Sequence, residues 1–295
     1  MTTVRFLDYI TYEKRFSPNT ILAYKIDLDQ FYDYLQRQYE VSGPKDITHP
    51  MIRSWIATLL ENDISPRSIN RKITTLKTYY RFLLKEKIVE ENPMQKILSQ
   101  KSPTRLPAFV QTDSMEKLFD QVEFKDNFEG HRDRIILELL YATGMRLSEL
   151  INLNTDDVDL PRLQLKVTGK RNKQRIIPFS NIISSKIENY LEKRKEVLAS
   201  GFVDSHLFIT DKGTKLYPKL VYRVVNHYLN EVTTLSKKSP HVIRHTFATH
   251  MLNNGADLNA IKEILGHANL AATQVYTHNT IEKLKSIYKQ AHPKA

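Results

Sequence analysis

Cysteine is absent from this 295-residue sequence, and glycine is scarce, with only eight residues. Without thiols the chain can form neither disulfides nor a cysteine-based catalytic or metal site. No two glycines are one residue apart and no Gly-x-x-x-x-Gly-Lys loop occurs, so the common nucleotide-binding motifs are excluded. No apolar run is long enough to span a membrane, and the N-terminus lacks a signal-peptide core. We therefore expect a cytoplasmic protein that does not associate with membranes.

Positive charge is in excess along the whole chain. The formal net charge is +11 and the isoelectric point is about 9.5. Residues 1–106 carry +5 and residues 107–295 carry +6, so the excess is not confined to one basic tail. This distribution favours a polyanionic partner, although a merely soluble basic protein would also show it.

The first 98 residues show four amphipathic helical patterns. These cover Thr3–Arg15 and the stretches that begin at Ser17-Pro18, Thr48-His49-Pro50 and Ser65-Pro66, where a hydroxyl precedes a first-turn proline. One side of the fourth helix is basic, which is typical of a DNA-binding surface but also of an ordinary solvated face. The cations on that side are Arg67, Arg71, Lys72, Lys77 and Arg81, and Tyr79 is expected to reach DNA with them.

Beyond these helices the sequence changes character. Segment 99–107 is polar, basic and proline-bearing, so we expect a linker there. In residues 108–295, a periodic helix stops at Gly144, two segments within 163–179 predict a β-hairpin, and further amphipathic helices follow. The expected fold class is therefore mainly α, with a small β-sheet in the C-terminal domain.

A stretch near the C-terminus that contains histidine and arginine is the most informative part of the sequence about function. His241 and Arg244 are three residues apart and share a helix face. Leu265-Gly266-His267 follows, and Tyr276 comes nine residues after that histidine. Cations that hold a phosphate would also assist a tyrosine attacking it, because a phenol with a pKa of about 10 is a weak nucleophile. Taken alone, His-x-x-Arg is more often structural, and the His241/His245 pair lacks the glutamate of a zinc motif.

These residues resemble the catalytic signature of the tyrosine recombinases, the integrase family, which runs His-x-x-Arg, Leu-Gly-His and then the nucleophilic tyrosine. The resemblance implies an earlier arginine, matched by Arg146 with Glu149 three residues on. It also implies a hairpin lysine. Lys170 fits, although the turn departs from the commonest family sequence and leaves Lys173 as an alternative. The resemblance covers nearly the whole chain and points to the short bacterial Xer-type members.

The resemblance implies a role for each residue. Arg146, Arg244 and His267 would hold the phosphate, Tyr276 would attack it, Lys170 would protonate the leaving 5′ oxygen, His241 would help move the tyrosine proton, and Glu149 would orient the site. Apart from the resemblance, the charge of the hairpin cations Arg171, Lys173 and Arg175 predicts contact with the DNA backbone. No metal or other cofactor is expected, because side chains supply the positive charge and one phosphodiester replaces another of similar energy.

The resemblance also implies an architecture and partners. Residues 1–98 would form a helical, SAM-like core-binding domain, 99–107 a linker, and 108–295 a catalytic domain whose last helix docks on a neighbouring protomer. The expected partners are double-stranded DNA, identical or related protomers in a tetramer on paired sites, and a DNA translocase as activator. The expected process is recombination through a Holliday junction that resolves chromosome dimers at segregation.

Other functions remain open at this point. A phage or transposon integrase would use the same residues, and a type IB topoisomerase would cleave in the same way but reseal the same strand. A DNA-binding regulator could keep the fold without the chemistry. The complete residue set argues against a regulator, since binding alone would not need Tyr276. The start of the sequence directly in core-binding helices favours the Xer-type role over an integrase.

Overall fold

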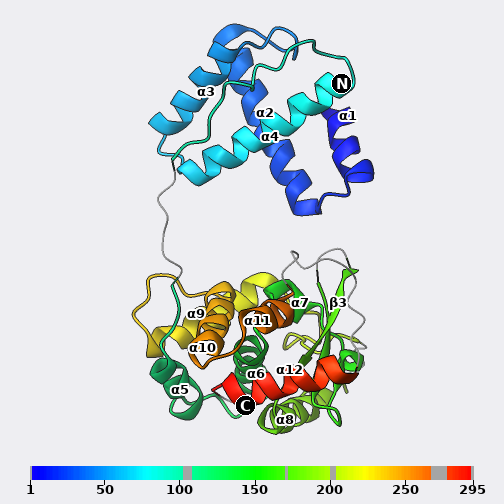
Figure 1. Ribbon diagram of the computed structural model, residues 1–295, viewed down its shortest axis with the longest axis vertical. Coiled ribbons are helices and arrows are strands. Elements are labelled where there is room, and N and C mark those ends of the chain that lie inside the picture. Colours follow the sequence, from blue (N-terminus) through cyan, green and yellow to red (C-terminus); the bar gives the residue numbers. More distant parts are fainter. Residues whose placement is uncertain (1, 102–107, 170–171, 200–203, 267–277, 294–295) are drawn as a thin grey trace. The chain divides into compact units, whose positions relative to one another are not determined.

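The computed structural model describes residues 2–101, 108–169, 172–199, 204–266 and 278–293. The chain divides into two compact units, unit 1 (Met1–Arg105) and unit 2 (Leu106–Ala295), each with its own hydrophobic core. Both are mainly helical, and unit 2 also contains a small antiparallel sheet (Figure 1), which confirms the predicted fold class. No helix within the described ranges is long and apolar enough to cross a membrane.

Unit 1 contains the four helices that the sequence predicts. They are α1 Thr2–Asp8, which continues into a π-helical turn at Tyr9–Glu13, α2 Pro18–Tyr39, α3 His49–Glu61 and α4 Pro66–Lys85. Ser17 and Ser65 accept hydrogen bonds from the backbone N–H groups of Thr20 and Ser68, both at 3.3 Å. The two serine caps are therefore in place, whereas Thr48 precedes α3 without a side-chain cap hydrogen bond. The apolar faces of the helices meet in one core.

A buried ion cluster joins α2 to α4. Asp27 is fully buried, and its carboxylate accepts hydrogen bonds from Lys72 Nζ at 3.0 Å, from Thr75 Oγ1 at 2.8 Å and from Arg71. Lys72 also donates to Gln30, and its side chain is only 7% exposed. The prediction that Lys72 lies on an exposed DNA-binding face is therefore wrong. The Lys72 ammonium lies in the helix interface because the buried Asp27 carboxylate of α2 pairs with it there, and a buried charge needs such a partner.

The other side chains expected on the basic face of α4 differ in exposure. Arg67, Arg71 and Arg81 are exposed, and Lys77 is half-buried. Tyr79 is fully buried in the core of unit 1, so the expectation that its ring reaches DNA is wrong. The solvent-facing part of this surface is formed mainly by the three arginines, which we call the α4 arginine face.

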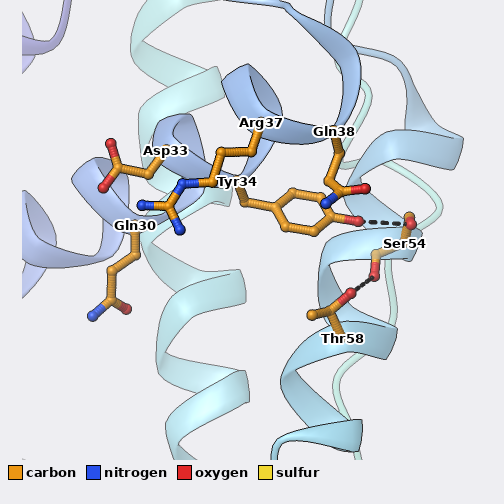
Figure 2. A pocket seen from close by; sticks show the side chains of 7 residues that line it. All are labelled: Gln30, Asp33, Tyr34, Arg37, Gln38, Ser54 and Thr58. Atoms are coloured by element: carbon orange, nitrogen blue, oxygen red, sulfur yellow. Dashed lines mark hydrogen bonds between the residues drawn. The ribbon is translucent and has the colours of Figure 1, made fainter.

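Unit 1 also contains a polar hollow of about 520 Å³ between α2 and α3, shown in Figure 2. It is lined by Gln30, Asp33, Tyr34, Arg37, Gln38, Ser54 and Thr58. The hydroxyl oxygens of Tyr34 and Ser54 lie 2.8 Å apart, so a hydrogen bond joins the two helices there. None of the residues with a predicted function lines this hollow.

Unit 2 is built around α6, Phe128–Thr143. Its other elements are α5 Thr112–Asp120, α7 Leu147–Ile151, the 3-10 turn Thr155–Asp157, β1 Val158–Asp159, β2 Gln164–Thr168, β3 Gln174–Pro178, α8 Asn181–Leu198, α9 Pro218–Val232, α10 Pro240–Asn253, α11 Leu258–Leu265 and α12 His278–Ala291. Every residue of α6 from 135 to 143 is buried, as expected for a helix enclosed on all sides. Helices α8 and α10 both pack against it.

The three strands form an antiparallel sheet in the order β1-β2-β3. The predicted hairpin is the β2–β3 pair, in which Leu165 faces Ile177 and Val167 faces Arg175. Leu165, Val167 and Ile177 belong to the core of unit 2. Because side chains alternate along a strand, Arg175 lies on the same inward face as Ile177. The sheet register thus turns an arginine toward the interior.

Local signals in the sequence mark several helix ends in unit 2. Gly144 ends α6 with a left-handed φ of +59°, as predicted for a glycine in this position. Asp257 accepts hydrogen bonds from two backbone N–H groups of the first turn of α11. Asp113 and Glu116 have the spacing of a capping box, but Gln111 precedes α5, so Asp113 lies inside the helix.

The last helix packs against its own unit. Helix α12 contacts β3, α10 and α11, and its C-terminal end buries Tyr288, Ala291 and the following His292. Asn254 Nδ2 donates to the carbonyl of Ala291 at 2.8 Å. Docking of this helix on a neighbouring protomer remains a prediction. Of the expected linker 99–107, residues 102–107 lie outside the described part of the chain.

Candidate active site

Arg146 and Arg244, both predicted to hold a phosphate, lie side by side in unit 2. Arg146 immediately precedes α7, and Arg244 lies in the second turn of α10. Both donate to the carbonyl oxygen of Leu265 at the end of α11, Arg146 Nη1 at 3.4 Å and Arg244 Nη2 at 2.7 Å. Arg146 also donates to Gly266 O at 3.3 Å, and Arg244 to Gly144 O at 2.6 Å. The pair therefore combines a buried guanidinium with one whose side chain is 39% exposed.

Glu149 connects this pair to a third guanidinium. Its Oε1 accepts from Arg146 Nη1 at 2.9 Å, and its Oε2 accepts from the Arg146 backbone N–H at 2.7 Å. Arg175 donates to both oxygens, Nη1 to Oε1 at 2.9 Å and Nη2 to Oε2 at 2.8 Å, in the bidentate geometry that suits these two groups. Arg146 and Glu149, three residues apart in the sequence, are therefore in direct contact, and the carboxylate is buried.

The charges in this cluster do not cancel, because three guanidinium groups face one carboxylate. Burial alone would raise the pKa of Glu149, but the hydrogen bonds and charge of Arg175, followed by the contacts with Arg146, hold this pKa below its ordinary value. Burial, followed by the charge of Arg146, lowers the pKa of Arg244 to about 10. Arg244 therefore stays protonated at neutral pH. The excess positive charge suits an anion such as a phosphate.

Two glycines permit the close approach of α6, α10 and α11. Gly144 has φ +59°, and a Cβ there would lie 2.4 Å from Phe247 Cδ1. Gly266 has φ +64°, and a Cβ there would lie 3.2 Å from Arg175 Cδ. Both positions need a residue that adopts the left-handed region and has no side chain. Their carbonyl oxygens accept from the site arginines, so these glycines help to shape the site.

A cavity of about 350 Å³ opens beside the arginine pair. It is lined by Arg146 and Arg244 together with His241, Met145, Leu147, Ser148, Pro218, Tyr222 and Pro240. The structure thus brings His241, at the start of α10, to the same space as both predicted phosphate-binding arginines. Tyr222 of α9 was missed by the sequence reasoning and is 46% exposed. Its signal was a large aromatic residue next to the buried Val221 on an outward position of the helix.

Several predicted residues cannot be placed in this geometry. Lys170, Arg171, His267 and Tyr276 lie outside the described residues. Lys173 is exposed on the hairpin, and its carbonyl accepts a hydrogen bond from the Gly169 N–H at 2.8 Å. The exposure of Lys173 agrees with a surface contact, and the roles of all five residues remain predictions.

Arg175 corrects the expectation of an exposed hairpin cation. Its side chain is 5% exposed, and its Nε donates to Ile264 O at 2.7 Å in addition to the contacts with Glu149. The prediction that Arg175 contacts the DNA backbone from the hairpin surface is therefore wrong. Strand alternation was the available signal, because Ile177, two residues later, is a core residue.

The remaining histidines of α10 support packing. His245 is half-buried beside the ring of Phe109, and burial, followed by the nearby His241, lowers its pKa. His250 is buried, with its Nδ1 2.8 Å from Tyr141 Oη. No group of three or more histidine, aspartate or glutamate residues in the described part of the chain could hold a metal ion, so no such group includes the His241/His245 pair.

Comparisons with known proteins extend over almost the whole sequence. Residues 108–283 match the phage integrase family, and residues 4–87 match the N-terminal SAM-like domain of phage integrases. The tyrosine recombinase XerC of Chlorobaculum tepidum is 40% identical, and the match covers 98% of this chain and 94% of that protein. The tyrosine recombinase XerC of Listeria monocytogenes is 38% identical, with 99% and 97% covered.

Two solved structures are similar in fold. The XerH site-specific recombinase bound to palindromic difH substrate gives a TM-score of 0.71 at 23% identity, covering 90% of this chain and 78% of that chain. The Tn1549 transposon integrase in complex with a circular intermediate DNA gives a TM-score of 0.72 at 20% identity, covering 97% and 99%. Three observations point to the same family. Both units match its sequence models, the relatives are similar over nearly their full length, and the arginines cluster as the family signature implies. The chain belongs to the phage integrase family and is a site-specific tyrosine recombinase.

Proposed function

We propose that this enzyme cuts and rejoins double-stranded DNA, with Arg146 and Arg244 as the centre that binds the scissile phosphate. The observation that carries the proposal is the convergence of these two guanidinium groups on Leu265 O, beside a cavity that His241 also lines. Guanidinium groups stay charged and donate in a plane, so they fit the non-bridging oxygens of a phosphodiester. Among the described residues, Arg244 uses two of its five N–H donors, which leaves donors for a substrate.

The proposed first step forms a covalent protein–DNA link. Tyr276 Oη attacks phosphorus while His241 helps to remove the phenolic proton. The bond between phosphorus and the 5′ oxygen breaks, and Lys170 gives that oxygen a proton. The product is a 3′-phosphotyrosyl link and a free 5′ hydroxyl.

The proposed second step reverses the chemistry on a different strand. A 5′ hydroxyl attacks the phosphotyrosine, loses its proton to the group that acted as acid, and releases Tyr276. Arg146, Arg244 and His267 stabilise the charge on the phosphate oxygens in both steps. Each phosphodiester is replaced by another, so no nucleotide is consumed.

Relatives that carry the name XerC support a proposal for the biological role. We propose exchange between paired chromosomal sites by four protomers, through a Holliday junction, as in chromosome-dimer resolution. A related recombinase as second subunit and a DNA translocase as activator belong to the same proposal, as does action in the cytoplasm. The α4 arginine face, with Lys77 and the hairpin cations Arg171 and Lys173, would hold the DNA backbone.

The decisive experiment uses a nicked suicide DNA that carries a candidate recombination site. The wild-type protein should form an adduct that survives denaturation, and Tyr276→Phe should form none. Tyr222→Phe is the matched comparison, since this tyrosine lines the cavity. An adduct that persists in Tyr276→Phe and disappears in Tyr222→Phe would reassign the nucleophile. Tight wild-type binding without any adduct, even with a partner recombinase added, would favour a binding-only protein.

A further inference from the structure

We propose that Arg175 is a positioning residue of the active site, which holds Glu149 and the end of α11 so that Arg146 and Arg244 face the phosphate. The inference rests on the proposed recombinase function. It gives a buried hairpin arginine a task in DNA cleavage that requires no contact with DNA.

The guanidinium of Arg175 connects three separate elements. Its Nε donates to Ile264 O of α11 at 2.7 Å, while Nη1 and Nη2 donate to the two oxygens of Glu149 on α7 at 2.9 and 2.8 Å. The residue itself belongs to β3. One rigid planar group therefore fixes the distances between the hairpin, α7 and α11.

The backbone of two glycines lies close to this ion pair. A Cβ at Gly266 would come within 3.2 to 3.3 Å of Cδ, Nη1 and Nε of Arg175, and a Cβ at Gly169 would lie 3.1 Å from Glu149 Oε1. Gly266 ends α11, and Gly169 follows β2 at the start of the hairpin turn. Neither segment can move far without breaking or displacing the contact between Arg175 and Glu149.

The same contacts determine the surroundings of the phosphate-binding pair. Glu149 Oε1 accepts from both Arg175 and Arg146, and α11 supplies the carbonyl that Arg146 and Arg244 share. Without Arg175, Glu149 would accept hydrogen bonds from Arg146 alone. It would then compete with the phosphate for the N–H donors of Arg146. The Ile264 carbonyl would also lose a donor, which would release the end of α11.

A lysine cannot reproduce these contacts. Its ammonium is a point charge that cannot donate in one plane to Ile264 O and to both oxygens of Glu149. It would nevertheless preserve the charge balance of the cluster. Arg175→Lys therefore separates the effect of geometry from the effect of charge, whereas Arg175→Met removes both.

The test compares full-length wild type, Arg175→Met, Arg175→Lys and the control Lys166→Met, which removes an exposed cation from the neighbouring strand. Single-turnover adduct formation on nicked DNA, DNA affinity at several salt concentrations and thermal unfolding are measured for each. We expect cleavage by Arg175→Met to be about 100-fold slower, because small misplacements of catalytic groups have effects of this size. The cleavage rate of Arg175→Lys should lie between the rates of Arg175→Met and wild type. The affinity and salt dependence of all variants should match wild type.

Three results would overturn the inference. Wild-type cleavage by folded Arg175→Met would mean that Arg175 supports stability alone. A weaker salt dependence of DNA binding in that variant would identify a direct phosphate contact. If Arg175→Met does not fold, a wild-type rate for Arg175→Lys would refute the positioning role. By contrast, failure of the wild type itself to form an adduct would reject the proposed function.

Discussion

Glu149 balances three guanidinium groups from its buried position on α7. Glu149→Gln would leave those guanidiniums without their carboxylate and would replace acceptors with donors on one side. We expect the free energy of unfolding to fall by about 3–5 kcal/mol, as when one partner of a buried ion pair is removed. Chemical denaturation measures this loss. A variant with wild-type stability would show that the cluster is already well solvated.

The same residue predicts how stability depends on pH. The pKa of Glu149 in the folded protein lies below the ordinary value of 4.5. A group with a lowered pKa contributes stability above its unfolded-state pKa and loses it as the pH falls. The stability difference between wild type and Glu149→Gln should therefore be largest near neutrality and shrink below about pH 4.5. Denaturation curves from pH 7 downward measure it, and a constant difference would contradict the prediction.

At the scale of residues, the sequence predicted those members of the site that share a local motif. Arg146 and Glu149 lie three residues apart, as do His241 and Arg244, so each pair could be placed on one face of a turn. The sequence could not predict the burial of Lys72, and for Arg175 it offered only the strand alternation with Ile177 as a signal. Their carboxylate partners are far away in the sequence, and their positions follow from the packing of other elements.

At the scale of elements, the ion cluster between α2 and α4 offers a test of how unit 1 is held together. Asp27→Asn would leave Lys72 buried opposite a neutral amide, and we expect a loss of about 3–5 kcal/mol in unfolding free energy. Lys72→Met in the same background should recover part of that loss, because it removes the unpaired ammonium. Chemical denaturation of the single and double variants measures the coupling. Additive effects would contradict the direct contact.

The end of α12 provides a second test at this scale. His292 stacks on Tyr288 with ring centroids 4.8 Å apart, and its Nε2 donates to Tyr141 O at 3.2 Å. Burial is the main cause that lowers the pKa of His292 to about 4. Stability from the neutral ring is therefore complete above its ordinary pKa of 6.5 and declines as the pH falls toward 4. About 3 kcal/mol could be lost in that interval.

His292→Phe keeps an aromatic ring in place but cannot be protonated. We expect the variant to lose less stability than wild type between pH 6.5 and 4, although it lacks the bond to Tyr141. Amide hydrogen exchange in α12 and the thermal midpoint report this difference. Parallel pH profiles for both proteins would show that His292 is not responsible.

The elements themselves were largely predictable because their signals are local. A few neighbouring residues are enough to indicate a serine-proline helix start, the glycine at position 144 that ends α6, or the alternation of a strand. Tyr79 was misplaced for the opposite reason. Helical spacing alone does not define the width of a buried stripe, and on α4 the neighbouring helices cover more of the circumference than the apolar residues indicate.

At the scale of the whole molecule, the net charge of +11 predicts strongly salt-dependent DNA binding. Each phosphate contact contributes a slope of about −0.9 in a plot of log affinity against log salt concentration. Arg67→Gln and Arg81→Gln should each reduce the magnitude of that slope by about this amount and weaken binding similarly on all sequences. Arg5→Gln, which removes an exposed cation of α1, is the control. Equal slopes for wild type and all variants would show that the α4 arginine face does not contact the DNA.

The three arginines of the cluster also hydrogen-bond to the carbonyl oxygens at the end of α11. The last carbonyls of a helix have no intrahelical donor, and here Arg175, Arg146 and Arg244 serve as the C-terminal cap of α11 for Ile264, Leu265 and Gly266. Alanine at any of them would fray this helix, and alanine at Arg146 or Arg244 would also remove a proposed phosphate ligand. The segment that follows α11 in sequence contains His267 and Tyr276. An alanine scan would therefore overstate the contribution of Arg146 and Arg244 to phosphate binding.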